Sequence, residues 1–198
     1  MELIHYLESH KPISKEDESL VTGAFERLEF KEGTMLSAVN QICKKLYFIC
    51  NGILRIVSVS EKGNDITHFF LKENYFCTIT NSFNNQIVAQ EGIQAATDVE
   101  VLAIGKEELS ELYLQVPHIK EVIQKVMQET LLQKVQVRNT YQGLDATSRY
   151  KLFLMLQPEV AARVSLGYIA SYLDITQQSL SRIRKNLSRS SYNQPTRP

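Results

Sequence analysis

The sequence of 198 residues predicts an α+β protein with an N-terminal double-stranded β-helix, or jelly roll, then one long helix and a C-terminal helix-turn-helix. Three observations predict this fold class. Residues 44–76 alternate between apolar and polar side chains, Pro117 to about Tyr141 contains no glycine or proline, and residues 169–185 have apolar spacings of three and four. We expect domain limits at 1–115, 116–142 and 143–198.

The first segment predicts a helix over residues 14–28. Ser14 is followed three residues later by Asp17, as at a helix N-cap. One helical face then carries Leu20, Val21, Ala24, Phe25 and Leu28. A short helix is expected before it, around residues 3–7.

The β-roll is predicted from the change to a period of two. Asn51-Gly52 separates two alternating runs and indicates a hairpin, because both residues tolerate positive φ. A second turn is expected at residues 62–65. The stretches GIQAATD and VEVLAI indicate a further pair that turns at Thr97-Asp98. Several short strands with regular turns and no helix between them favour a sandwich or jelly roll.

The long helix spans about 25 residues, or about 37 Å. Its expected stripe consists of Ile119, Ile123, Val126, Thr130 and Val137. Leu131, Leu132 and Val135 widen this stripe. Such a broad apolar surface needs cover on more than one side, so we expect the β-roll on one side and a second copy of the helix on the other. Packing entirely within one chain is the alternative.

The C-terminal part predicts three helices. Asp145 is expected to cap the helix ATSRYKLFLML, which ends before Pro158. Asp174 follows a short apolar helix where the chain must turn, and aspartate tolerates the left-handed conformation. Thr176 can cap the last helix, whose inward face is Leu180, Ile183 and Leu187. The polar tail SRSSYNQPTRP is expected to be mobile.

The outward residues of the last helix are the candidate DNA-binding residues. They are Gln177, Gln178, Ser179, Ser181, Arg182, Arg184 and Lys185. Glutamine pairs bidentately with adenine and arginine with guanine, whereas serine and basic residues suit phosphates. From residue 142 onward eight Lys and Arg face three acids, a net +5, so residues 1–141 carry −5. This asymmetry favours double-stranded DNA as a partner; an ordinary solvated helix face is the alternative.

At the stretch IASYLDITQQSLSRIRK the chain resembles the CRP/FNR family of bacterial transcription regulators. The resemblance extends to residues 32–76, which are similar to the family's cyclic-nucleotide-binding-type β-roll. It implies a homodimer joined through the long helix, base contacts by Gln177, Gln178 and Arg182, and contact with RNA polymerase. Asp174 stands where the family usually has glycine. No counterpart of the β-hairpin wing follows Leu187, so we expect a winged-helix-like domain with its wing reduced or absent.

The effector prediction depends on a departure from the family pattern. Members that bind cyclic AMP have Gly-Glu and, some ten residues later, Arg-Ser or Arg-Thr. The matching positions here, which are the candidate effector-pocket residues, are Cys77, Thr78, Ala89 and Gln90. A buried cyclic phosphate without an arginine partner is costly. We therefore expect a small effector other than cyclic AMP, if the protein has one; its identity is not predicted.

No metal, haem or iron–sulfur site is predicted. Cys43, Cys50 and Cys77 are dispersed and form no CxxC, so they suit neither a closed thiolate site nor a cluster. His68 is the only histidine of the roll, and we interpret it as a packing residue rather than a ligand.

Two other functions are alternatives. The C-terminal domain could bind a protein instead of DNA, with the roll as a ligand sensor. A cupin-like metal enzyme would need two or three histidines and a carboxylate inside the barrel, so no catalytic residue is predicted. The sequence has no apolar run of about 20 residues and no secretory signal, which predicts a cytoplasmic protein without a membrane partner.

Overall fold

The computed structural model describes residues 2–192. The chain divides into two compact units, residues 1–140 and 141–198. The long helix, which the sequence set apart at 116–142, belongs to the same compact unit as the strands. We describe each unit by itself.

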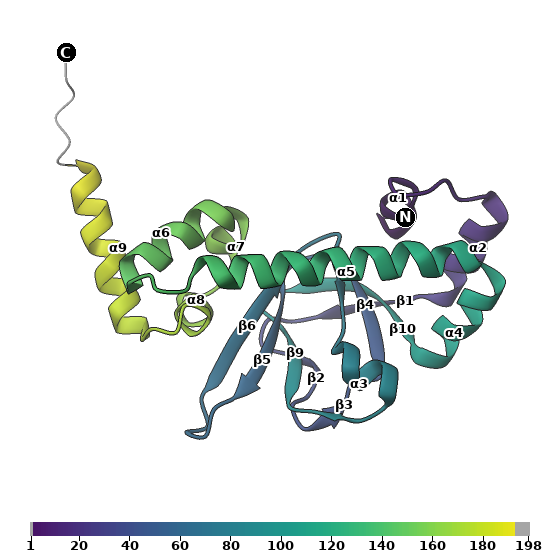
Figure 1. Ribbon diagram of the computed structural model, residues 1–198, viewed down its shortest axis with the longest axis horizontal. Coiled ribbons are helices and arrows are strands. Elements are labelled where there is room, and N and C mark those ends of the chain that lie inside the picture. The colour runs from purple at the N-terminus through teal and green to yellow at the C-terminus, as the bar shows by residue number, and fades with distance from the viewer. Residues whose placement is uncertain (1, 193–198) are drawn as a thin grey trace, which may run out of the picture. The chain divides into compact units, whose positions relative to one another are not determined.

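The first unit, over its described residues 2–140, consists of ten strands and five helices (Figure 1). The helices are α1 (Glu2–Glu8), α2 (Lys15–Ala24), α3 (Thr80–Asn85), α4 (Lys106–Gln115) and α5 (Pro117–Thr140). The strands are β1 (Glu26–Phe30), β2 (Met35–Ser37), β3 (Gln41–Ile42), β4 (Lys45–Asn51), β5 (Leu54–Val59), β6 (Asp65–Leu71), β7 (Phe76–Cys77), β8 (Val88–Ala89), β9 (Glu91–Ala95) and β10 (Val99–Gly105).

Two four-stranded sheets form the roll, in the orders β1-β10-β4-β7 and β2-β9-β5-β6, with β3 and β8 as a separate pair. Buried residues such as Ile49, Leu54 and Ile93 fill one core. A second core joins Phe48 and Ile104 of the first sheet to α1, α2, α4 and α5, and Figure 1 shows the three shorter helices near the N-terminal half of α5. The mixed fold with a jelly-roll domain, a long helix and C-terminal helices is therefore confirmed.

Two of the expected hairpins are wrong. Gly52 does adopt a positive φ of 93°, but β4 and β5 belong to different sheets. The connection at Thr97-Asp98 likewise joins β9 to β10 in the other sheet. Of the three expected turns, the one expected at 62–65 does close a hairpin, although its loop lies at residues 60–64, between Val59 and its partner Asp65. Local sequence specifies where the chain turns, whereas the partner of each strand depends on distant residues.

The helix predicted over 14–28 is shorter than expected. Ser14 accepts a hydrogen bond from the Asp17 N–H at 3.1 Å, as the N-cap prediction required, but the helix ends at Ala24. Residues 26–30 form β1 instead and pair with β10, so that Glu26 lies opposite Ala103. The helical spacing of Leu28 favours a longer helix, but strand pairing prevails. Each residue of β1 pairs with a residue at the edge of β10, which a helix over 26–30 would leave unpaired.

Gly52 allows a test of this sheet-to-sheet connection. A Cβ at Gly52 would overlap the Asp98 carbonyl oxygen and lie 2.8 Å from Val99 Cα. Gly63 also has a positive φ, 77°, but nothing lies within 4 Å of its Cβ position. We expect Gly52→Ala to lower the free energy of unfolding by about 3 kcal/mol and Gly63→Ala by about 1 kcal/mol. Urea denaturation measures both, and equal losses would contradict the packing argument.

The long helix α5 is confirmed, but its apolar residues are arranged differently from the prediction. Ile119, Ile123, Val126 and Thr130 are at most 7% exposed within their own chain. They pack largely into the second core, and Val137 is half-buried. The first four residues are therefore already covered within their own chain.

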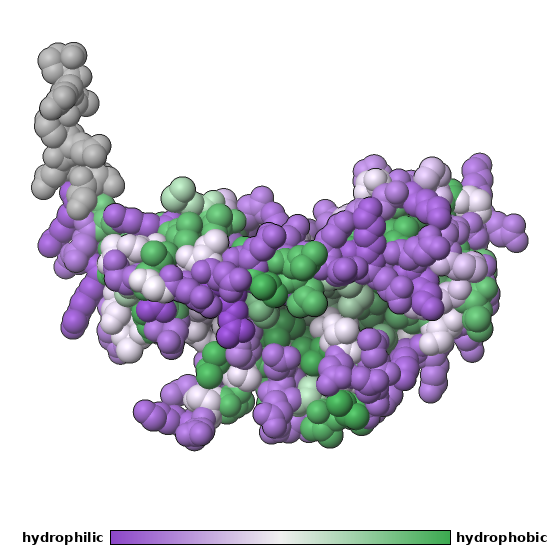
Figure 2. Space-filling model, in the orientation of Figure 1, coloured by the Kyte–Doolittle hydropathy of each residue, from purple (hydrophilic) through white to green (hydrophobic). Residues whose placement is uncertain are grey.

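A different face of α5 remains apolar and exposed. Leu131, Leu132 and Val135 are 60%, 56% and 48% exposed. At 100° per residue this group is centred about 160° away from the buried residues. Figure 2 shows apolar surface over the middle of α5. The helix thus has two apolar faces rather than one broad stripe.

None of the helices in residues 2–192 combines the length and the apolar character that crossing a membrane requires.

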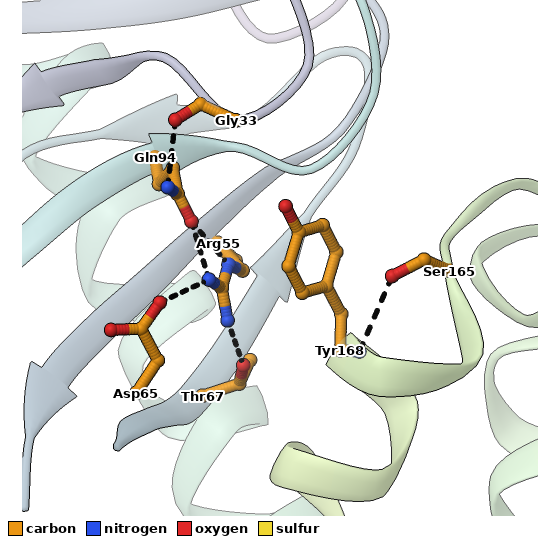
Figure 3. A network of polar contacts seen from close by, with 7 residues as sticks. All are labelled: Gly33, Arg55, Asp65, Thr67, Gln94, Ser165 and Tyr168. Atoms are coloured by element: carbon orange, nitrogen blue, oxygen red, sulfur yellow. Dashed lines mark hydrogen bonds and ion pairs between the residues drawn. The ribbon is translucent and has the colours of Figure 1, made fainter. Parts of the chain in front are cut away.

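A buried arginine ties three strands of the second sheet together (Figure 3). Arg55 is 2% exposed, and its guanidinium donates to Gln94 Oε1 and to Thr67 Oγ1, each at 2.7 Å. Its Nη2 also lies 2.8 Å from Asp65 Oδ2. The Gln94 amide in turn donates to the Gly33 carbonyl at 2.7 Å. The alternation of residues 44–76 predicts strands here but does not indicate this network.

The second unit, as far as residue 192, contains four helices: α6 (Ala146–Leu156), α7 (Pro158–Arg163), α8 (Leu166–Tyr172) and α9 (Gln177–Tyr192). Asp145 caps α6 as predicted, accepting from the N–H groups of Thr147 at 2.8 Å and Ser148 at 3.0 Å. These hydrogen bonds lower the pKa of Asp145. The sequence missed α7. It also placed Ser188–Tyr192 in a mobile tail, whereas they continue α9; the rest of that tail lies outside the described residues.

Candidate nucleic-acid interface and effector pocket

Helices α8 and α9 are joined by a tight turn that follows the sequence prediction. Asp174 has a φ of 54°. The Ile175 N–H donates to the Ala170 carbonyl at 3.0 Å, and the Asp174 N–H donates to the Ser171 carbonyl at 3.3 Å. These two bonds form a Schellman motif, which satisfies the last carbonyls of α8. At the other end of α8, Ser165 accepts from the Tyr168 N–H at 3.4 Å (Figure 3).

The start of α9 is fixed by the predicted cap. Thr176 Oγ1 accepts from the Ser179 N–H at 3.1 Å and donates to the Ser179 hydroxyl at 2.9 Å. Ser179 is therefore half-buried and engaged in the cap, unlike the other candidate DNA-binding residues. Leu180 is fully buried, while Ile183 and Leu187 are half-buried, so the inward face lies where the sequence placed it.

The remaining candidates lie on the exposed side of α9. They are Gln177, Gln178, Ser181, Arg182, Arg184 and Lys185. At 100° per residue they occupy an arc of about 160°. We call these six residues the polar arc. Figure 2 shows hydrophilic surface over α9.

Two further arginines were missed as site residues. Arg189 is exposed seven residues after Arg182, two turns further along the same side of α9; the spacing of seven was the available signal. Arg149 of α6 donates from Nη1 to the Leu173 carbonyl at 2.7 Å, at the end of α8. This hydrogen bond links α6 to the turn before α9. Sequence analysis counted Arg149 only as a charge, because its partner is a backbone oxygen 24 residues away.

The roll contains a pocket of about 460 Å³. Its lining residues are Ser58, His68, Ile79, Asn81, Ser82, Ile87, Val88, Ala89, Gln90 and Glu91. Two candidate effector-pocket residues, Ala89 and Gln90, line it. Cys77 and Thr78 do not, so the structure does not bring the four candidates together.

Cys77 and Thr78 make contacts elsewhere in the roll. Cys77 lies on β7 opposite Tyr47, with its side chain in the core of the roll, and burial raises the pKa of its thiol to about 12. Thr78 Oγ1 donates to the Lys45 carbonyl at 3.0 Å. Cys77 is thus covered by the core, and the half-buried Thr78 donates its hydroxyl hydrogen to the backbone.

The sequence predicted His68 to be a packing residue, and the structure agrees with this only in part. Its Nε2 lies 2.7 Å from Ser58 Oγ, so the ring is hydrogen-bonded, but it also lines the pocket. Among residues 2–192 no group of three or more His, Cys, Asp or Glu side chains could hold a metal ion.

Comparison with known proteins is consistent with this geometry. Residues 27–116 match the model of the cyclic nucleotide-binding domain. No curated protein shows significant sequence similarity to the chain.

Several solved structures share the fold over most of the chain. The regulator CLP of Xanthomonas campestris, described as c-di-GMP responsive, has a TM-score of 0.71 at 17% identity, covering 90% of this chain and 93% of that one. A protein described as a CRP/FNR-family regulator from Eubacterium rectale has a TM-score of 0.73 at 16% identity, covering 94% and 88%. A CRP/FNR-family regulator from Thermus thermophilus has 0.66 at 16%, covering 84% and 88%.

The chain shares with these three proteins a fold that consists of a β-roll, a long helix and C-terminal helices. More particularly, residues 27–116 match the model of the cyclic nucleotide-binding domain, and the chain shares the fold of the two proteins described as CRP/FNR-family regulators, as the resemblance predicted.

Proposed function

We propose that the protein is a homodimeric, sequence-specific DNA-binding transcriptional regulator of the CRP/FNR type. The observation that carries the proposal is the polar arc of α9, with amide, hydroxyl and basic side chains and no acidic one. The turn before it is held at both sides, by the Schellman motif of α8 and by the Thr176 cap. A capped helix that presents such side chains from its first turn suits the major groove.

The dimer contact we propose is the exposed apolar face of α5, Leu131, Leu132 and Val135. The buried face of the same helix already packs in its own unit, which leaves the exposed face for a second copy. A two-fold dimer would present two recognition helices about one DNA turn, roughly 34 Å, apart. The operator is then expected to be a pseudo-palindrome. Contact with RNA polymerase follows from the resemblance alone.

The effector we propose is a small molecule other than cyclic AMP. The match to the cyclic nucleotide-binding domain concerns the fold of residues 27–116. The described lining of the pocket contains no arginine or lysine. A cyclic phosphate would lack a charge partner there. Effector binding would act by shifting the population between two placements of the C-terminal unit.

The DNA-binding proposal is tested at Arg182. The operator is first selected from a random pool of duplex DNA. Arg182→Ala is expected to weaken binding to that operator by about 1–3 kcal/mol, roughly 5- to 150-fold, and to relax discrimination at one base position. Repeating the selection with the variant measures both effects. An unchanged sequence profile would refute base contact by Arg182.

Lys185→Ala is the matched control on the same helix. A lysine that contacts phosphate should weaken binding to all sequences alike and reduce the slope of log K against log salt by about 1. If the C-terminal unit bound a protein instead of DNA, neither variant would change retention on random duplex DNA, and that retention would show no salt dependence.

A further inference from the structure

The pocket of the roll has one polar wall built from three adjacent strands. Glu91 of β9 lies opposite Ser58 of β5 in the sheet register. Next to Ser58, the pairing of β5 with β6 shifts by one residue between Ile56 and Val57, so that His68 is the extra residue of a β-bulge. Bulges re-aim side chains. Here the His68 ring lines the pocket, 2.7 Å from the Ser58 hydroxyl.

The opposite wall offers mostly apolar contact. Ile79 is buried, whereas Ile87 and Val88 are 46% and 60% exposed at the pocket. The Ser82 hydroxyl donates to the Ile87 carbonyl at 2.5 Å and accepts from the Cys43 N–H at 2.9 Å, so it is occupied by the protein's own backbone. A ligand therefore meets apolar side chains here, together with the neutral amides of Asn81 and Gln90.

The charge of the lining disfavours an anionic ligand such as a cyclic nucleotide. Glu91 is the one formally charged residue that the description places in the lining, since neither lysine nor arginine occurs there. Arg55 lies on β5 three residues before Ser58 and does not line the pocket. Its guanidinium donates to Gln94 and Thr67 and pairs with Asp65. The Lys134 ammonium lies 5.1 Å from the centre of the Phe69 ring and does not line the pocket.

We infer that the pocket binds a small molecule without phosphate or carboxylate groups, neutral or cationic, that presents N–H or O–H donors to Glu91 and to the Ser58–His68 pair. Its apolar edge would face Ile87 and Val88. A volume of about 460 Å³ lies within the range of small-molecule sites. The inference rests on the proposed function only in taking this pocket as the effector site. Because Glu91 is exposed, selection against anions is expected to be severalfold rather than absolute.

The test uses the full chain and a set of fragments in three groups matched for size: anionic, neutral with donors, and cationic. Ligand-observed NMR scores binding to the parent, to Glu91→Lys and to Glu29→Lys. Glu29 is an exposed glutamate on β1 outside the lining, and it serves as the matched control. The parent and Glu29→Lys should bind neutral and cationic fragments severalfold more often than anions, whereas Glu91→Lys should shift binding toward anions.

Equal binding of anions by the parent, identical behaviour of the two variants, or binding of no fragment at all would each overturn the inference. DNA retention, measured on the same preparations, reports on the proposed function separately. A variant that retains DNA while the fragment preference fails would refute the ligand class alone.

Discussion

Replacing both Leu131 and Val135 with glutamate is expected to convert the protein into monomers and to weaken operator binding by about 100- to 10,000-fold. The two residues lie four apart on the exposed apolar face of α5, which we propose as the dimer contact. Opposed carboxylates in that contact would have to be desolvated without a cationic partner. A monomer loses the effective concentration that links the two half-sites, so it binds each one separately.

Leu114→Glu is the matched control for this substitution. Leu114 is a leucine of α4 that is 82% exposed and lies outside the exposed face of α5. Sedimentation measures the oligomeric state, and titration of the selected operator measures affinity. If the control dissociates the dimer as well, or if the double variant stays dimeric, α5 is not the contact that holds two copies together.

Arg55→Ala is expected to lower the free energy of unfolding by about 3 kcal/mol. The substitution removes charge-assisted hydrogen bonds to Thr67 and Gln94 and the pairing with Asp65. It also leaves space where a side chain that is 2% exposed had been packed. Relief from burying a charge offsets part of this loss, because a desolvated guanidinium is itself costly.

Arg27→Ala provides the comparison. Arg27 also pairs with two acids, Glu2 at 3.0 Å and Glu100, but its side chain is 43% exposed. Exposed ion pairs contribute little, so a loss below about 1 kcal/mol is expected. Urea denaturation of both variants distinguishes the two cases. Equal losses would mean that the burial of Arg55 adds nothing to its hydrogen bonds.

The local features of the candidate site were predictable from sequence. The caps at Asp145 and Thr176 and the left-handed turn at Asp174 depend on one residue and its neighbours within three positions. The outward position of Arg182 and Lys185 follows from helical period once Leu180 faces inward. Arg149 and the pocket could not be found in this way, because the residues they depend on are distant in the chain: Arg149 reaches Leu173, and Ser58 shares the pocket with Glu91.

The sequence by itself determined the N-caps at Ser14, Asp145 and Thr176, the basic character of the C-terminal part, and the lack of an arginine at the positions where the family binds a cyclic phosphate. Only the tertiary structure decided which sheet each strand joins, which face of α5 is already covered, and that Ser58, His68 and Glu91 share one wall of a pocket. The physical reason is one of range. Capping and backbone strain act between neighbours in the chain, whereas strand pairing and burial depend on residues that only folding brings together.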